Sequence, residues 1–178
     1  MVEFPRLFAG GPAELIAFAP WRPSDRNAVV AFVSDILVGE FGFPVLPDEF
    51  QDLEDAVAAY DGGGFWCAWA GNSLVGTLGL MPFGTSYGML RRMFVARDWR
   101  GRQHGIALGL LQALIDCARG RHIDSIFLGT TAEFPAAHAF YEKNGFVEVA
   151  KKALPSSFPW QPSDDVFFRL RLSQEGGE

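Results

Sequence analysis

The chain has 178 residues, 49% of them hydrophobic and 20% charged, which suits one globular domain with a substantial core and excludes a disordered chain. Its net charge of −6 argues against a general nucleic-acid binder, which normally carries a basic excess. No window approaches the roughly 20 apolar residues of a membrane span, and the first residues lack the pattern of a signal peptide.

The first half of the chain predicts a strand, two helices and an antiparallel hairpin, in that order. Ser24 is a candidate N-cap for a helix within residues 22–37, which carries apolar residues at helical spacing. Acidic residues early in 48–60 favour a second helix, because the helix dipole stabilises negative charge there. A Gly-Asn turn joins two aromatic and β-branched runs in the hairpin. The strands of this half are expected at 14–21, 64–69 and 73–83.

The second half alternates strands with helices. A helix from Gly105 to about Arg119 has apolar residues at the spacing i, i+3, i+4 and i+7. A second helix at 135–145 begins with Pro135 and ends with Gly145, the usual order of these residues at helix ends. The strands are expected at 87–95, 123–131, 146–154 and 164–172. Together the elements predict an α/β or α+β domain with helices on a mixed sheet.

A basic cluster lies where the strand at 87–95 leads into the helix from Gly105. Residues 91–102 hold five arginines and one acid, a local charge of +4, so the rest of the chain carries −10. A helix N-terminus exposes backbone N–H groups, and Gly101 and Gly105 let a ligand approach the backbone. We therefore expect an anionic ligand such as phosphate, and a solvated basic turn is the alternative. The chain lacks GxxxxGK[ST], and lacks GxGxxG after a strand, so a triphosphatase or dinucleotide oxidoreductase has little support.

Three motifs of the second half stand in the order and at the spacing of one protein family. Arg102, Gly105 and Ala107 in "RGRQHGIALGLL" fit [RQ]xxGx[GA], and this segment resembles the coenzyme A pyrophosphate motif of the GNAT superfamily of N-acetyltransferases. The segments "LRRMFV" and "FLGTT" are similar to that family's fourth and fifth strands, and "AAHAFYEKNGF" to its helix-to-strand signature. "ALPSSFPWQPSDDVFFRL" resembles an "LP..FP....D..F" segment of a bacterial branch. A second register, on Arg100, Gln103 and Gly105, fits the first motif in part.

The resemblance covers residues 88–170 and implies a GNAT-like fold. That fold is a mixed, mostly antiparallel central sheet of about six to seven strands flanked by about four helices. The resemblance also implies one domain over residues 1–178, with a variable acceptor half at 12–83 and a coenzyme A half with C-terminal strands at 87–172.

The resemblance further implies an N-acetyltransferase that carries acetyl from acetyl-CoA to a primary amine of a small molecule or peptide. The amine attacks the thioester directly, so Cys67 and Cys117 are not expected to be nucleophiles. Backbone N–H groups of 102–107 would bind the pyrophosphate, the strand would pair with pantetheine, and an N–H near Phe94 would polarise the thioester carbonyl. The residues assigned to the coenzyme in this way are Met93, Phe94, Val95, Arg100, Gly101, Arg102, Gln103, His104, Gly105, Ile106, Ala107, Thr130 and Phe140.

Two proton transfers complete the implied reaction. Tyr141 stands where the family carries the general acid for the leaving thiolate, and the alternative is an aromatic residue of the core. Many members place a glutamate base on the fourth strand, but this chain has Met89 there. Glu133 and Glu40 are the candidates that remain, each with an ordinary solvated carboxylate as the alternative. Phe134 replaces an asparagine that many members use to bind the coenzyme.

Several alternatives stay open. A non-catalytic acyl-CoA binding module would keep the coenzyme site without the base, and a phosphate-binding regulatory domain would not bind coenzyme A. Aromatic residues of the first half line an acceptor cleft or belong to the core, namely Phe41, Phe43, Phe65, Trp66 and Trp69. The histidines do not cluster, so no metal is expected. We expect a cytoplasmic protein with reduced cysteines and no nucleic-acid or membrane partner, and a homodimer through the C-terminal strand is compatible with the sequence.

Overall fold

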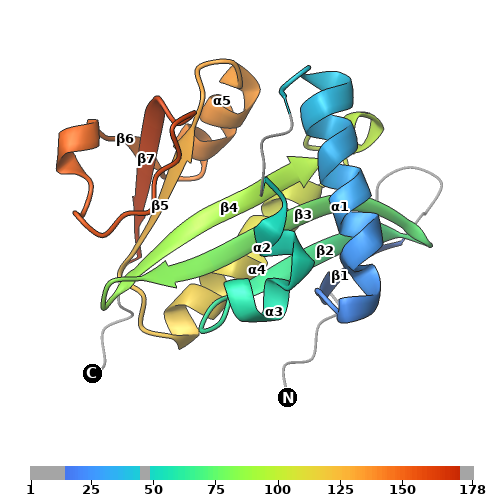
Figure 1. Ribbon diagram of the computed structural model, residues 1–178, viewed down its shortest axis with the longest axis horizontal. Coiled ribbons are helices and arrows are strands. Elements are labelled where there is room, and N and C mark those ends of the chain that lie inside the picture. Colours follow the sequence, from blue (N-terminus) through green and yellow to red (C-terminus); the bar gives the residue numbers. More distant parts are fainter. Residues whose placement is uncertain (1–14, 45–48, 173–178) are drawn as a thin grey trace.

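One seven-stranded sheet runs through the molecule (Figure 1), a computed structural model in which residues 15–44 and 49–172 are described. The strand order is β1-β2-β3-β4-β5-β7-β6, and only β4 and β5 run parallel to each other. The strands are β1 (Ile16–Pro20), β2 (Gly64–Ala70), β3 (Ser73–Phe83), β4 (Tyr87–Val95), β5 (Ser125–Thr130), β6 (Val147–Glu148) and β7 (Val166–Arg171). The predicted mixed, mostly antiparallel sheet is confirmed. Residues 12–14 and 48, which the sequence analysis assigned to the acceptor half and to a helix, lie outside the described residues.

Five α-helices and several short helical turns accompany the sheet in the described residues. The α-helices are α1 (Arg26–Ser34), α2 (Gln51–Glu54), α3 (Ala56–Ala59), α4 (Ile106–Gly120) and α5 (Pro135–Lys143). α1 continues as the π-helical segment η2 (Asp35–Glu40), and the 3-10 turns are η1 (Pro23–Asp25), η3 (Arg97–Trp99) and η4 (Lys151–Ala153). The predicted helices at 105–119 and 135–145 are confirmed within two residues at each end, and Gly145 has φ 87° just beyond α5.

Ser24 does not cap the first helix, contrary to the sequence-based prediction. Pro23 opens the turn η1, and Asp25 stands at the N-cap position of α1. The Asp25 carboxylate accepts a hydrogen bond from the backbone N–H of Arg22 at 2.9 Å. Proline is favoured in a first helical turn because it has no N–H that needs a partner. The turn therefore starts before Ser24 and leaves the serine inside it.

The predicted helix at 48–60 is divided into α2 and α3. Asp55 has φ −141° and ψ 80°, and its carboxylate accepts a hydrogen bond from the Ala58 N–H at 3.1 Å. Aspartate readily leaves the helical conformation to cap a following turn. The predicted strand at 146–154 is also shorter, because η4 follows β6. In η4 the ammonium of Lys151 lies 3.2 Å from the centroid of the Trp160 ring.

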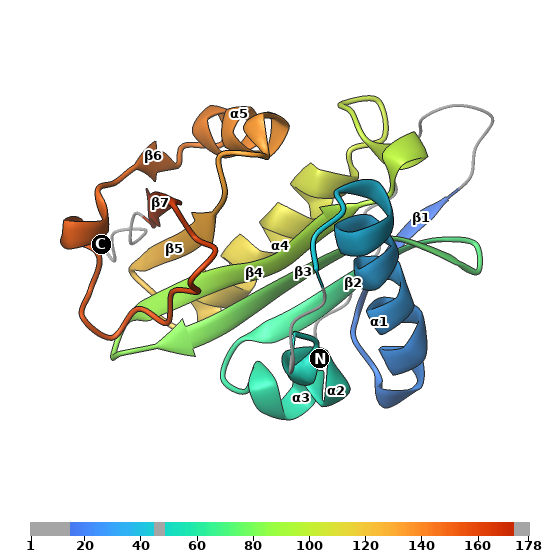
Figure 2. The ribbon, with the colours of Figure 1, turned by 45° about the horizontal axis from the view of Figure 1, so that its top comes forward.

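Helices cover both faces of the sheet (Figures 1 and 2). α1, α2 and α3 lie on one face, here called the front, and α4 and α5 on the other, the back. On β2, Phe65 and Cys67 point into the front core while Trp66 and Ala68 point into the back core, as strand alternation requires. Met81 packs against the front core and against a second front cluster, formed by Met89, Phe127, Phe158 and Phe167. The segment after η4 therefore covers the front of β5 and β7.

Candidate active site

The two parallel strands at the centre of the sheet separate soon after they meet. β4 and β5 pair only between Tyr87–Met89 and Ser125–Phe127, and Figure 1 shows the two ribbons diverging beyond that point. From Leu90 to Val95 the described residues place β3 along one edge of β4 and no strand along the other. Met93, Phe94 and Val95, which the sequence analysis assigned to the coenzyme, lie on this stretch. An unpaired strand edge suits pairing with an extended ligand.

A β-bulge shapes β4 at the place where the strands diverge. The register with β3 shifts between Thr77 and Gly79, so that Arg92 and Met93 together face Leu78. Arg92 has φ 53°, a left-handed conformation that is uncommon outside glycine. The buried Thr77 hydroxyl donates a hydrogen bond to the Arg92 carbonyl at 2.8 Å and so holds the bulge. Bulges re-aim a strand beside many active sites.

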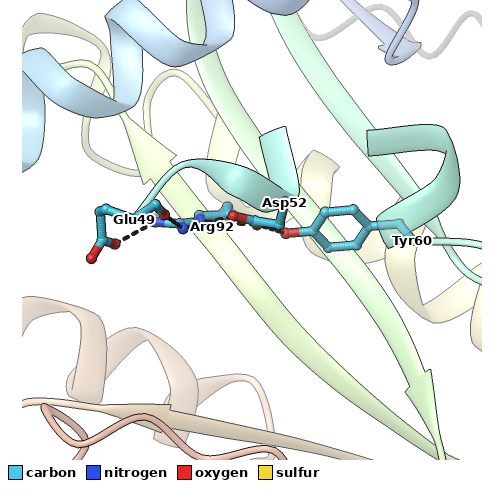
Figure 3. Close-up of polar contacts among 4 residues, drawn as sticks. All are labelled: Glu49, Asp52, Tyr60 and Arg92. Carbon is cyan, nitrogen blue, oxygen red and sulfur yellow. Dashed lines mark hydrogen bonds and ion pairs between the residues drawn. The ribbon is translucent and has the colours of Figure 1, made fainter. Parts of the chain in front are cut away.

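The side chain of Arg92 joins this bulge to the front layer (Figure 3). Its guanidinium donates to Asp52 through Nη2 at 2.7 Å and through Nε at 3.1 Å. It also contacts the carboxylate of Glu49, at 3.0 Å, and the backbone carbonyl of that residue. The Tyr60 hydroxyl donates to Asp52 at 2.5 Å. We call Glu49, Asp52, Tyr60 and Arg92 the Arg92 network.

The charges of the Arg92 network are mutually stabilised. Burial disfavours the charged form of Asp52, but the hydrogen bonds and charge of Arg92 outweigh burial and hold the pKa of Asp52 below its usual value. Burial and the charge of Asp52 raise the pKa of the Tyr60 hydroxyl well above its usual value. Arg92 is therefore committed to a buried ion pair, and it is not available to an anion at the basic turn. Arg92 is one of the five arginines of the predicted basic cluster, but its partners Asp52 and Glu49 lie 40 and 43 residues earlier in the chain, so the local sequence does not show the pairing.

The basic turn between β4 and α4 has the backbone geometry expected of an anion site. Gly101 and Gly105 have φ of 105° and 66°, in the left-handed region. Gly105 is the N-cap of α4, and no side chain among residues 15–44 and 49–172 caps this helix. The N–H groups of the first helical turn therefore lack the partner that a capping side chain would supply. At a helix N-terminus such groups favour a negative charge.

The side chains of this turn differ in their surroundings. Arg102 and Gln103 are exposed, and His104 lies against Trp99 with ring centroids 5.3 Å apart. Ile106 is buried in the back core, so only its backbone can reach a ligand, and Ala107 is half-buried. The exposed charge of Arg102 makes it the arginine of this turn that is best placed to meet solvent-borne phosphate.

Arg100 is held by protein groups. Its guanidinium pairs with both carboxylate oxygens of Glu40, with Nη2 to Oε2 at 2.7 Å, and its Nε donates to the Val95 carbonyl at 2.8 Å. Arg97 lies 3.8 Å from the same carboxylate. The hydrogen bond from Arg100 is the main cause that lowers the pKa of Glu40. Glu40 is thus a weaker base than an ordinary glutamate, and its charge offsets part of the basic turn.

Tyr141 lies in the back core. Its ring packs against Phe146 and Phe168, with centroids 5.6 and 5.7 Å away, and against its neighbour Phe140 at 6.0 Å. The residue is 6% exposed, and burial raises the pKa of its hydroxyl. The phenol therefore keeps its proton at neutral pH, which a general acid requires. Burial at this level equally fits a core aromatic.

The remaining candidates lie around the ends of β5 and α5. Glu133 is exposed, and its backbone N–H is bound by the Thr131 hydroxyl at 3.0 Å. Thr130 ends β5, and its carbonyl accepts the N–H of Asp165 at 3.0 Å. Asp164, which sequence reasoning missed, lies beside Gly129 of β5. Its position in the "LP..FP....D..F" segment was the signal available in the sequence.

An aromatic contact joins the front layer to α5. Phe134, the N-cap of α5, lies edge-on to Phe41 with centroids 4.7 Å apart and 5.7 Å from Phe43. By contrast Phe65 and Trp66 are buried in the core and Trp69 packs against it. Among the aromatic residues proposed to line an acceptor cleft, Phe41 and Phe43 are the ones that contact Phe134 at the start of α5.

Comparisons with known proteins agree on one family. The chain matches the model of the Acetyltransferase (GNAT) family over residues 30–146. A GNAT-family acetyltransferase from Staphylococcus aureus Mu50 is 33% identical, with a TM-score of 0.83 over 89% of this chain and 99% of that one. N-acetylaspartate synthetase of Xenopus tropicalis is 33% identical over 129 residues, which are 71% of this chain and 47% of that protein. N-acetylglutamate synthase from Neisseria gonorrhoeae, crystallised with coenzyme A and N-acetyl-glutamate, has a TM-score of 0.68 at 17% identity, over 89% of this chain and 35% of that one.

These similarities determine the family to which the chain belongs. It spans about half the length of the named relatives that it matches by sequence. No helix within residues 15–44 and 49–172 is long and apolar enough to cross a membrane, and the same residues hold no cluster of three metal-ligating side chains. Because the family match covers more than half of the sequence, and a close structural relative shares nearly its whole fold, the chain belongs to the GNAT family of acetyltransferases.

Proposed function

We propose that the protein is an N-acetyltransferase that carries acetyl from acetyl-CoA to a primary amine of a small molecule or peptide by direct attack. One observation carries the proposal. The unpaired edge of β4 leads into the glycine turn and into the uncapped N-terminus of α4. An extended ligand with an anionic end fits this sequence of groups, and coenzyme A joins a pantetheine arm to a pyrophosphate. A structural relative was crystallised with coenzyme A, which supports the choice of cosubstrate.

The coenzyme would lie along the edge of β4. Backbone N–H groups of 102–107 bind the pyrophosphate, with Arg102 adding charge, and Met93 to Val95 pair with the pantetheine arm. An N–H near Phe94, beyond the bulge, polarises the thioester carbonyl. Arg100, Gly101, Gln103, His104, Thr130 and Phe140 complete the proposed coenzyme surface.

In this proposal Tyr141 donates a proton to the departing thiolate. Its raised pKa keeps the phenol protonated until the thiolate develops beside it. An acyl-enzyme on Cys67 is not part of the mechanism, because burial raises the pKa of that thiol to about 12.

The acceptor is proposed from the named relatives. N-acetylaspartate synthetase and N-acetylglutamate synthase are both named for an acetylated amino acid. The α-amino groups of aspartate and glutamate are therefore the first acceptors to test, before peptides and polyamines. A homodimer and a cytoplasmic location belong to this proposal. β7 lies between β5 and β6, so a dimer through it would use the part that β6 leaves unpaired.

The proposal also divides the single domain into two halves. Residues 12–83 form the acceptor half, and residues 87–172 form the coenzyme A half with the C-terminal strands. The front layer of α1 to α3 belongs to the first half, and α4 and α5 belong to the second, which supports this division.

The test combines binding with turnover. The protein is incubated with acetyl-CoA and aspartate, glutamate, a dipeptide or a polyamine, and free coenzyme A and acetylated amine are measured by mass spectrometry. Release of coenzyme A that depends on one amine, with an equal amount of acetylated product, supports the proposal. Binding of coenzyme A in calorimetry without release for any amine favours the non-catalytic binding module. No binding of coenzyme A contradicts both and favours the phosphate-binding regulatory domain.

A further inference from the structure

The carboxylate of Asp164 lies against β5 because the chain there is fastened at several points. The segment between β6 and β7 passes in front of β5 in both views (Figures 1 and 2). The Asp165 N–H donates to the Thr130 carbonyl at 3.0 Å, and its carboxylate accepts the Ala132 N–H at 2.9 Å. Asp164 closes a turn on Gln161, since its N–H donates to the Gln161 carbonyl at 2.9 Å and its Oδ2 accepts the Gln161 N–H at 2.8 Å. These bonds fix where the carboxylate points.

Gly129 makes the room for this carboxylate. A Cβ atom at Gly129 would overlap Oδ2 of Asp164 and would come within 3.0 Å of its Cβ. Only glycine therefore admits the carboxylate to this position against the strand. The contact with Asp164, in the segment between β6 and β7, therefore explains why a glycine stands in "FLGTT".

The position is beside the diverging strands and on the front of the sheet. Gly129 lies two residues beyond Phe127, the last residue of β5 paired with β4, and Arg91 lies two beyond Met89 on β4. Phe127 and Met89 belong to the front cluster, so alternation places Gly129 and Arg91 on the front as well. The helix α4, whose N-terminus is the proposed pyrophosphate site, and Tyr141, the proposed acid, lie on the back. Asp164 thus lies near the point where β4 and β5 diverge, on the face of the sheet opposite to α4 and Tyr141.

The charges around Asp164 allow it to take up a proton. Burial raises its pKa, and this outweighs the Gln161 N–H and the positive charge of Arg91, which lower it; Asp165 raises it further and Lys151 lowers it. The groups that face Asp164 are thus Arg91 of β4, Lys151 of η4, and Gln161 and Asp165 of its own segment. Glu40 is tied to Arg100, Glu133 is exposed, and Met89 has no basic atom.

We infer that Asp164 is the proton acceptor for the attacking amine, an inference that rests on the proposed function. The ammonium form of the acceptor gives one proton to Asp164, and the neutral amine then forms a bond to the thioester carbon. The carbon–sulfur bond breaks, the thiolate takes a proton from Tyr141, and the second proton of the amine nitrogen restores Tyr141. Asp164 returns its proton to water, so the reaction yields amide, thiol and one proton.

The test compares Asp164→Asn with Asp165→Asn in the full chain. Asparagine keeps an oxygen that can accept the Gln161 N–H, so the turn remains, and the control removes the same charge one residue away. kcat/KM is measured from pH 6 to pH 9 for the best alkylamine acceptor. In the parental enzyme the base makes kcat/KM nearly independent of pH below the amine pKa. Without the base only unprotonated amine reacts. The ratio of parental to Asp164→Asn kcat/KM should therefore fall about tenfold for each unit by which the pH rises toward the amine pKa of about 8 to 10.

Gly129→Ala provides a second variant, because its methyl group displaces the carboxylate without removing it. It should reproduce the pH-dependent deficit of Asp164→Asn, with coenzyme A affinity within about twofold of the parental value. A deficit that is equal at every pH would show a structural role and overturn the inference, as would parental rates in Asp164→Asn. Absence of amine-dependent turnover in the parental enzyme would instead contradict the proposed function, so the two failures are distinguishable.

Discussion

At the scale of single residues, the side chains that could act in catalysis or binding differ in the groups that they contact. Glu40, Asp52, Arg92 and Arg100 are all paired in ion pairs within the protein. Tyr141 packs among aromatic rings, and burial raises its pKa. The family resemblance and the local charge predicted a role for several of these residues, and the ion pairs decide which remain available to a ligand.

The Tyr141→Phe variant tests whether Tyr141 is a general acid or only an aromatic residue of the core. Phenylalanine keeps the ring and its packing against Phe146 and Phe168 but removes the proton. We expect an unchanged melting temperature and coenzyme A affinity, and turnover lower by about 10²-fold or more when proton donation limits. The decrease in turnover should be smaller for an acyl donor with a more acidic thiol, because its thiolate can leave without being protonated. Parental turnover under conditions where chemistry limits would identify a core residue.

Asp52→Asn tests the Arg92 network. Asp52 has a lowered pKa in the folded state, so the stability it contributes is present above its unfolded pKa of about 4 and is lost as the pH falls through the folded value. At neutral pH the substitution should cost about 3 to 5 kcal/mol in the free energy of unfolding, because it leaves a buried guanidinium short of a partner.

The measurement is urea denaturation of the parental protein and the variant from pH 7 to pH 3. The difference between them should narrow toward acid as parental Asp52 is protonated. Asp61→Asn, which removes a carboxylate from an exposed residue next to Tyr60, is the control and should change stability by less than about 0.5 kcal/mol. A gap of constant size across this pH range would mean that ionised Asp52 does not stabilise the fold.

At the scale of elements, the sequence predicted the helices whose positions depend on residues within them or next to them. α4 was predictable from the spacing of its own apolar residues, and α5 from Pro135 at its start and Gly145 just after its end. The helix expected at 48–60 divides because Asp55 caps α3 and Asp52 serves Arg92, forty residues away. The divergence of β4 and β5, the bulge at Arg92 and the contact of Asp164 with Gly129 are likewise non-local. Motif order predicted a coenzyme turn, but it could not predict which of its arginines are neutralised by carboxylates.

Gly105→Val tests the turn that precedes α4. Gly105 has φ 66° at an uncapped helix N-terminus, so a β-branched side chain strains the turn and obstructs the approach of a phosphate. We expect coenzyme A affinity, measured by calorimetry, to fall at least tenfold. Gly71→Val is the matched control, since that glycine has φ 55° in the β2–β3 turn with open space around it. Equal coenzyme A affinity in folded Gly105→Val would exclude this turn as the pyrophosphate site.

At the scale of the whole molecule, the sheet separates two working surfaces. The front carries α1 to α3, the Arg92 network and the segment that holds Asp164, and the back carries α4, α5 and Tyr141. The Arg92 network and the pair Glu40–Arg100 attach the front layer to β4 and to the turn that follows it. In the proposed reaction, acceptor and coenzyme would therefore meet where β4 and β5 diverge, each from its own face of the sheet.

The segment that crosses the front of β5 brings a distant stretch of the sequence to the proposed site. The family match ends at residue 146, whereas the carboxylate that rests on Gly129 is at residue 164. A group beside the proposed reaction centre is thus encoded outside the residues that the family model matches, on a stretch anchored by β6 at its start and β7 at its end. In the proposed reaction, the proton acceptor and the coenzyme site therefore lie on separate stretches of the chain, and the acceptor can take its position only because residue 129 is a glycine.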